Sequence, residues 1–94
     1  MDEARVTSKT LRIINEKGLH ARASAKFVEV VEQHDAQAAV TKDGMTVSGD
    51  SIMGLLMLAA SRGTSIDVTT SGTQAEMLAD ALEALVANRF GEDY

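Results

Sequence analysis

The dipeptide Asp43–Gly44 separates two short segments, Gln37–Lys42 and Met45–Ser48, that both read as β-strands. Glycine accepts the positive φ angle that a tight turn between antiparallel strands requires, so this pattern predicts a hairpin. Apolar and polar residues also alternate in Thr7–Ile14 and in Ser65–Thr70, which predicts two more strands. Together, the hairpin and the alternation favour a mostly antiparallel sheet.

Three further segments show the apolar spacing of three and four residues that is typical of helices. We expect helices from Ala21 to about Gln33, from Ser51 to about Ala60, and from Thr73 towards the C-terminus. Gly63 is expected to stop the second helix, and Thr73 with Glu76 to form a capping box for the third. The side chains expected to face the core are Ser24, Phe27, Val28 and Val31 in the first helix and Ala75, Leu78, Leu82, Leu85, Val86 and Phe90 in the last.

The resulting element order, β-α-β-β-α-β-α, predicts a single α+β domain over residues 1–94 with its helices packed on one face of the sheet. The chain has no cysteine, which excludes disulfides and thiolate metal sites. A net charge of −5 and 3% aromatic residues argue against nucleic acid as a partner. The polar segment Met1–Lys9 does not resemble a secretory signal, and the longest apolar run, Ile52–Ala60, is too short to cross a bilayer. We therefore expect a cytoplasmic protein with no membrane partner.

His20 stands at the junction between a glycine-containing loop and the first predicted helix, where histidine is a poor structural filler. At the N-cap of that helix, its ring would lie beside free backbone N–H groups and the positive end of the helix dipole, which together favour an anion. Arg22 adds a guanidinium group that matches phosphate geometry, and Gly18 permits a close backbone approach. These features fit a histidine that carries a phosphoryl group transiently.

Other interpretations of His20 stay open at this point. A histidine near a helix start is often an ordinary surface residue. A shared metal ion with His34 is disfavoured, since the two would lie roughly 21 Å apart along one helix at about 1.5 Å per residue. A Ser24–His20 hydrolase pair is possible by spacing, but it lacks a nucleophile elbow and an orienting acid. No metal or cofactor is predicted.

The segment "GLHARASAKFV" resembles the active-site segment of the histidine-containing phosphocarrier proteins (HPr) of the bacterial phosphotransferase system. The resemblance extends from Val6 to about Phe90 and includes the Asp43–Gly44 hairpin and "DSIMGLLML". The segments "SIMGLLMLAASRGTSIDV" and "FGED" are more similar to the nitrogen-related branch (NPr). The family resemblance implies an open-faced β-sandwich, in which a four-stranded antiparallel sheet is covered on one face by three helices.

The resemblance also implies a function and a site. Enzyme I would phosphorylate His20, which would pass the phosphoryl group to a histidine of an EIIA-type protein, with Arg22 contacting that group. The chain would be a monomeric phosphoryl-transfer intermediate rather than an enzyme acting on a small substrate. Ser51 would match the serine that a serine kinase/phosphorylase modifies for regulation. The residues implied to dock both partners, besides Arg22, are Ala21, Ala25, Ile52, Met53, Leu56 and Met57.

Three of these implications have simpler alternatives. Ser51 precedes an apolar run, so a role as helix N-cap, worth about 1 kcal/mol, would explain it. The run "IMGLLMLAA" could be a helix sunk into the core rather than a docking surface. Ala23 stands where the family usually has proline; we expect the loss of rigidity to loosen the active loop without removing a chemical group. A binding module of the same fold without phosphoryl relay remains the rival function.

Overall fold

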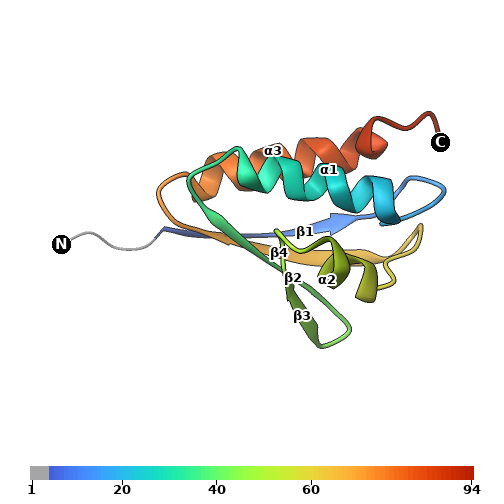
Figure 1. Ribbon diagram of the computed structural model, residues 1–94, viewed down its shortest axis with the longest axis horizontal. Helices are drawn as coiled ribbons and strands as arrows, with labels where there is room; N and C mark the ends of the chain where they lie inside the picture. The colour runs from blue at the N-terminus through green and yellow to red at the C-terminus, as the bar shows by residue number, and fades with distance from the viewer. Residues whose placement is uncertain (1–4) are drawn as a thin grey trace.

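Four antiparallel strands form one sheet in the computed structural model, which describes residues 5–94. The strands are β1 (Val6–Arg12), β2 (Gln37–Lys42), β3 (Met45–Ser48) and β4 (Ser65–Ser71), in the spatial order β1-β4-β2-β3 (Figure 1). Residues 1–4 lie outside the described residues; they are the first part of the polar segment Met1–Lys9, which we do not expect to be a secretory signal. The four predicted strands are confirmed, and so is the antiparallel pairing.

The ends of the strands follow from local backbone chemistry. In the hairpin between β2 and β3, Asp43 and Gly44 both have positive φ angles, 51° and 81°, as a type I′ turn requires. The first strand is shorter than predicted because Ile13 leaves the β1–β4 ladder. Its N–H donates to the Thr64 carbonyl at 2.8 Å and its carbonyl accepts from the Gly63 N–H at 2.7 Å. This pairing closes the loop before β4.

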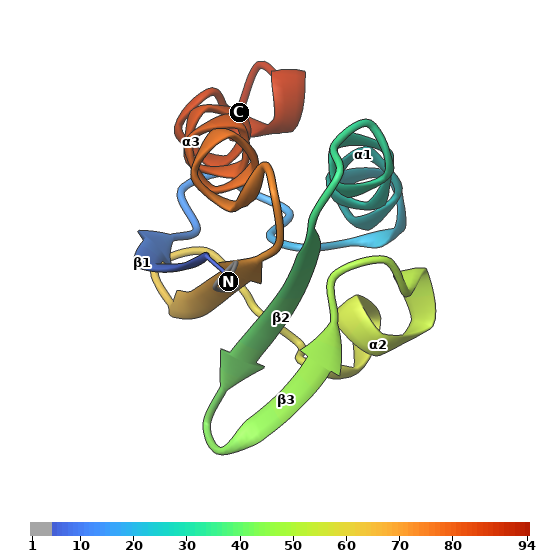
Figure 2. The same ribbon diagram turned by 90° about the vertical axis from the view of Figure 1, so that its left-hand side faces the viewer.

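Three α-helices complete the fold: α1 (Ala21–Glu32), α2 (Ile52–Met57) and α3 (Ala75–Ala87). Figure 2 shows α1 and α3 side by side over the sheet, with α2 next to β3. A short 3₁₀ helix, η1 (Arg89–Gly91), follows α3. Within residues 5–94, no helix combines the length and the apolar character needed to cross a bilayer. The arrangement is the predicted open-faced α+β sandwich.

The core between the sheet and the helices contains the side chains that the helical periodicity predicted, except for Leu85. Phe90 is buried as predicted, but it lies in η1 and not in α3. In α1, Ser24, Phe27, Val28 and Val31 are buried, as expected. In α3, Leu85 is only half-buried and packs against the margin of the core, whereas Ala79 is fully buried. A small side chain suits that position because α3 lies directly on β1 and β4. The predicted burial of Leu85 is therefore wrong in degree.

The second helix ends earlier than predicted. It stops at Met57, and Ala59 takes a left-handed conformation with φ 51°. The carbonyl of Ala60 accepts a hydrogen bond from the Leu19 N–H at 2.9 Å, so this residue serves the loop before α1 instead of the helix. Gly63, the predicted stop, lies in the turn before β4 with φ 90°.

The predicted capping box at Thr73 and Glu76 is also wrong. The N-cap position of α3 is Gln74, whose side chain does not cap the helix. Its Oε1 accepts from the Asp35 N–H at 2.7 Å, and its own N–H donates to the Asp35 carbonyl at 2.9 Å. The start of α3 is therefore set by a contact with the loop that follows α1.

Candidate active site at the start of α1

His20 occupies the N-cap position of α1, as predicted. Its backbone is extended (φ −80°, ψ −175°), and its carbonyl accepts the first helical hydrogen bond from the Ser24 N–H at 2.8 Å. The imidazole does not cap the helix, and 27% of the side chain is exposed. The ring is thus accessible at a helix end whose free N–H groups and dipole favour an anion.

The loop before His20 is fixed against the end of α2. Gly18 has φ 67°, and a Cβ atom there would lie 2.5 Å from the carbonyl oxygen of Ala60. Only glycine meets both the conformation and the close approach. The neighbouring Leu19 N–H donates to the same carbonyl, which anchors the residue immediately before His20. The hydrogen bond between the Leu19 N–H and the Ala60 carbonyl therefore connects the segment after α2 to the residue before His20.

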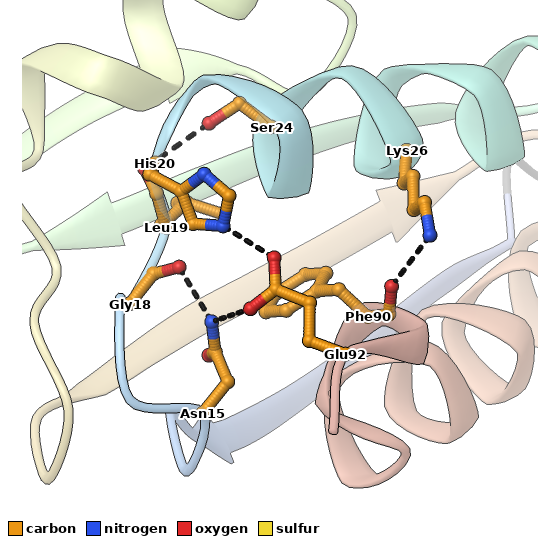
Figure 3. Close-up of polar contacts among 8 residues, drawn as sticks. All are labelled: Asn15, Gly18, Leu19, His20, Ser24, Lys26, Phe90 and Glu92. Carbon is orange, nitrogen blue, oxygen red and sulfur yellow. Dashed lines mark hydrogen bonds and ion pairs between the residues drawn. The ribbon is translucent and has the colours of Figure 1, made fainter. Parts of the chain in front are cut away.

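Glu92 is the site residue that the sequence reasoning missed. Its Oε2 is in hydrogen-bond contact with Nε2 of His20, and its Oε1 accepts from Nδ2 of Asn15 at 3.0 Å (Figure 3). The same Asn15 Nδ2 donates to the Gly18 carbonyl at 2.8 Å. The side-chain amide of Asn15, which is fully buried, therefore links the Glu92 carboxylate at His20 to the loop that precedes the histidine.

The C-terminal segment is held in place by packing and by backbone contacts. Phe90 is fully buried, and its carbonyl accepts from Nζ of Lys26 at 2.9 Å. The Glu16 N–H donates to the Tyr94 carbonyl at 3.1 Å. These contacts bracket Glu92 and bring it to His20 from 72 residues away. In the sequence, the "FGED" ending, which is similar to the nitrogen-related branch, is the signal that could have pointed to Glu92.

The charge of Glu92 is determined by opposing effects. Burial alone would raise its pKa, but hydrogen bonds donated by Asn15 and His20 outweigh it, together with the charges of His20 and Lys17. The net result is a pKa below the usual value of 4.5, so the carboxylate is ionised at neutral pH.

An open cleft of about 550 Å³ lies beside the ring of His20. Arg22, which is exposed, lines it together with Lys17 and Lys26, and three acidic residues, Glu16, Glu92 and Asp93, line it as well. Cations, a nucleophilic ring and a helix N-terminus are the groups that a phosphoryl group requires. A second, shallower cleft of about 310 Å³ connects His20 to Leu56 of α2.

The structure also bears on the alternatives raised for His20. Glu92 is an acid in contact with the His20 ring, so the predicted lack of an orienting acid is wrong. Ser24, however, is fully buried and its hydroxyl donates to the Leu19 carbonyl at 3.2 Å, which disfavours a Ser24–His20 hydrolase pair. His34 lies at the opposite end of α1, with Nδ1 2.8 Å from the Val30 carbonyl. Ala23, in the place of the family proline, is fully buried in the first turn of α1. Ser24, His34 and Ala23 therefore add no catalytic group to the cleft.

Ser51 and α2 lie next to this site. Ser51 is the N-cap of α2, and its Oγ accepts from the Gly54 N–H at 2.9 Å, as its position predicted. The helix buries Leu55 but exposes its other side, so a helix sunk into the core is ruled out. Of the docking residues implied by the resemblance, Met53 is 70% exposed and Leu56 is half-buried, and the other exposed ones are Ala21, Ala25, Ile52 and Met57.

Comparison with known proteins agrees with this geometry. Residues 7–88 match the family model described as the PTS HPr component phosphorylation site. The chain is 46% identical to the phosphocarrier protein HPr of Cupriavidus necator over 80 residues, which cover 85% of this chain and 90% of that protein.

Two solved structures are similar over most of the chain. The chain superposes on HPr-C-His from Thermoanaerobacter tengcongensis with a TM-score of 0.89 and 35% identity, covering 94% of this chain and 99% of that one. It superposes on a phosphocarrier protein HPr from Bacillus anthracis with a TM-score of 0.82 and 38% identity, covering 86% and 96%. The fold, the position of the histidine and these relatives lead to one conclusion: the chain belongs to the HPr family of phosphocarrier proteins of the phosphotransferase system.

Proposed function

We propose that the protein relays a phosphoryl group through His20. The observation that carries this proposal is the accessible imidazole at the N-cap of α1, which opens into a cleft bordered by Lys17, Arg22 and Lys26. A ring nitrogen of His20 attacks the phosphorus atom of the donor, and the donor bond to phosphorus breaks with its electron pair returning to the donor. Arg22 neutralises charge on the phosphoryl oxygens.

The donor and the acceptor are two proteins that use the same face. The donor is enzyme I, charged by phosphoenolpyruvate, and the acceptor is a histidine of an EIIA-type protein. Docking is assigned to the exposed side of α2 with the start of α1, because Leu56 and His20 line one continuous cleft. Exposed methionines suit a surface that must adapt to two partners. No small substrate is turned over.

Regulation is assigned to Ser51. It lies at the first turn of α2, directly before the exposed Ile52 and Met53, so a phosphate there would border the docking face. The enzyme that adds it would be a serine kinase/phosphorylase. The segments "SIMGLLMLAASRGTSIDV" and "FGED" favour the nitrogen-related branch of the system. We take residues 1–94 as one monomeric domain acting in the cytoplasm, where phosphoenolpyruvate is produced.

A transfer assay tests the relay. The chain is incubated with enzyme I and phosphoenolpyruvate, and then with an EIIA-type protein; acid-labile phosphate is measured at each stage. The wild type should gain phosphate and pass it on, whereas His20→Ala should do neither and keep its circular dichroism spectrum. His34→Ala is the matched control, since it removes the other histidine of the sequence and should relay normally. Docking without phosphorylation of the wild type would instead support the rival, a binding module without relay.

A further inference from the structure

Lys26 and Arg22 lie one helical turn apart on α1, and both line the cleft beside His20. Their surroundings differ: Arg22 is exposed, whereas Lys26 is half-buried and its Nζ donates to the Phe90 carbonyl at 2.9 Å (Figure 3). We propose that Lys26 is a positioning residue whose ammonium group stabilises the strained turn η1 and thereby keeps Glu92 against the His20 ring. The inference rests on the proposed function of His20, and it assigns Lys26 to the C-terminal segment rather than to the phosphoryl group.

The backbone of η1 needs such a contact because three successive residues are left-handed. The φ angles are 55° at Arg89, 55° at Phe90 and 80° at Gly91. This conformation is costly for residues with a Cβ atom, and a bulky residue such as phenylalanine rarely adopts it. Glycine suits the third position for a second reason, since a Cβ atom there would lie 3.1 Å from Nζ of Lys26. The turn is therefore strained at two residues and shaped to admit the ammonium group at the third.

Several contacts oppose this strain, and one of them comes from α1. The Phe90 side chain is fully buried, which fixes the ring but leaves the backbone carbonyl in need of a donor. The Lys26 ammonium group supplies a charge-assisted hydrogen bond, which is stronger than a neutral one. The N–H groups of Gly91 and Glu92 donate to the carbonyls three residues earlier, both at 2.9 Å, and close the turn on itself. Of these hydrogen bonds, the one from Lys26 joins the backbone of η1 to α1.

This contact bears on the site because Glu92 directly follows η1. The Glu92 carboxylate contacts the His20 ring and accepts from Nδ2 of Asn15 at 3.0 Å. A carboxylate in that place restricts the orientation of the ring and stabilises the positive charge that the ring gains on phosphorylation. Lys26 therefore acts on the ring through Glu92, two residues beyond the carbonyl that it holds. Arg22 forms no ion pair within residues 5–94, so its guanidinium group is left for the phosphoryl oxygens.

A double-mutant cycle separates this role from a direct contact between Lys26 and the phosphoryl group. Lys26→Met keeps the unbranched stem and removes the ammonium group, and Glu92→Ala removes the carboxylate. In single-turnover phosphorylation by enzyme I, each should slow transfer by about tenfold. The double variant should be no slower than Glu92→Ala, because both changes remove the same contact with the ring. A direct contact predicts that the two effects multiply, and that result overturns the proposal, as does a wild-type rate for either single variant.

Relief of the strain provides a second test. Arg89→Gly removes the cost of the first left-handed residue without restoring a cation. In the Lys26→Met background it should raise the transfer rate about two- to fivefold, the gain in population that a compatible glycine provides. An ammonium group that acted on the phosphoryl oxygens could not be replaced in this way. A double variant that transfers no faster than Lys26→Met overturns the proposal.

Amide hydrogen exchange measures the contact without any transfer. Lys26→Met should speed exchange of the Gly91 and Glu92 N–H groups at least about tenfold, because the turn opens more often. Lys42→Met is the matched control: the Lys42 Nζ donates to Oδ2 of Asp43 at 2.8 Å, but in the β2–β3 hairpin. It should change neither these exchange rates nor the transfer rate. Unchanged exchange at both amides in Lys26→Met overturns the proposal. If the wild type accepts no phosphate, the relay itself fails, and hydrogen exchange still decides the role of Lys26.

Discussion

Replacing Met53 by aspartate should separate docking from folding. Met53 is 70% exposed and occupies the second position of α2, after the N-cap Ser51 and Ile52. Folding therefore buries less than a third of the side chain. The loss on folding is about 0.5–1 kcal/mol, from about 1.5–3 kcal/mol for full burial of such a side chain. A carboxylate in the first turn of a helix recovers part of that loss. The melting temperature should stay within a few degrees of wild type.

Binding should respond much more strongly. Covering the exposed part of Met53 in a complex is worth about 1–2 kcal/mol, which the variant loses. Desolvating the new carboxylate at an apolar contact adds about 1–3 kcal/mol. The sum, about 2–5 kcal/mol, raises Kd from about 30-fold to several thousand-fold, at 1.4 kcal/mol per factor of ten. Both enzyme I and the EIIA-type acceptor should be affected.

Titration calorimetry with each partner, paired with thermal melts, measures both effects. Met77→Asp is the matched control: Met77 is also exposed and also lies in the first turn of a helix, α3, but outside the proposed docking face. It should bind like wild type. Equal affinities for Met53→Asp and Met77→Asp would refute docking through α2. A collapsed melting temperature for Met53→Asp alone would contradict the exposure on which the reasoning rests.

Three further outcomes are expected. Arg22→Ala should slow phosphorylation about tenfold without abolishing it, because the nucleophile survives and an exposed guanidinium loses only charge stabilisation; an unchanged stopped-flow rate would remove Arg22 from the site. Ser51→Asp should keep the N-cap and a melting temperature within a few degrees of wild type, yet slow phosphorylation by enzyme I. Ser51→Ala should lose the cap, which lowers the free energy of unfolding by about 1 kcal/mol and the melting temperature by about 4–8 °C. Since the folded pKa of Glu92 is depressed, its ionisation stabilises the fold above the usual pKa of 4.5, and that stability is lost as pH falls through the lower folded value. Melts of wild type and Glu92→Gln should therefore differ by a constant amount above about pH 5 and converge below it; a gap independent of pH would contradict this.

The order and faces of the elements were predictable because local patterns determine them. Alternation identified β1 and β4, the Asp43–Gly44 turn specified the hairpin of β2 and β3, and three-and-four spacing gave the buried side of α1. The errors arose where a distant contact outweighed a local signal. The end of α2 is set by the Leu19–Ala60 hydrogen bond rather than by Gly63, and the start of α3 by the pairing of Gln74 with Asp35 rather than by Thr73.

The site was predictable to a similar extent. The position of His20 at a helix N-cap, with Arg22 nearby, can be predicted from residues 17–22 alone. The structure brings both side chains to one cleft. Glu92 could not be read in this way. It belongs to a short polar ending with no periodicity, and it reaches the histidine only because Phe90 is buried and Asn15 bridges the gap. Because Glu92 reaches His20 only through tertiary contacts, no local sequence pattern identifies it.

The central claim, that His20 carries the phosphoryl group, is tested most directly by locating the phosphorus atom. Protein labelled with ¹⁵N-histidine is phosphorylated by enzyme I and phosphoenolpyruvate, and ³¹P–¹⁵N couplings are recorded. The sequence contains two histidines, so His34 serves as an internal reference. We predict that the phosphorus couples to a ring nitrogen of His20 and to neither nitrogen of His34. Coupling to His34, or phosphate on no histidine at all, would contradict the account.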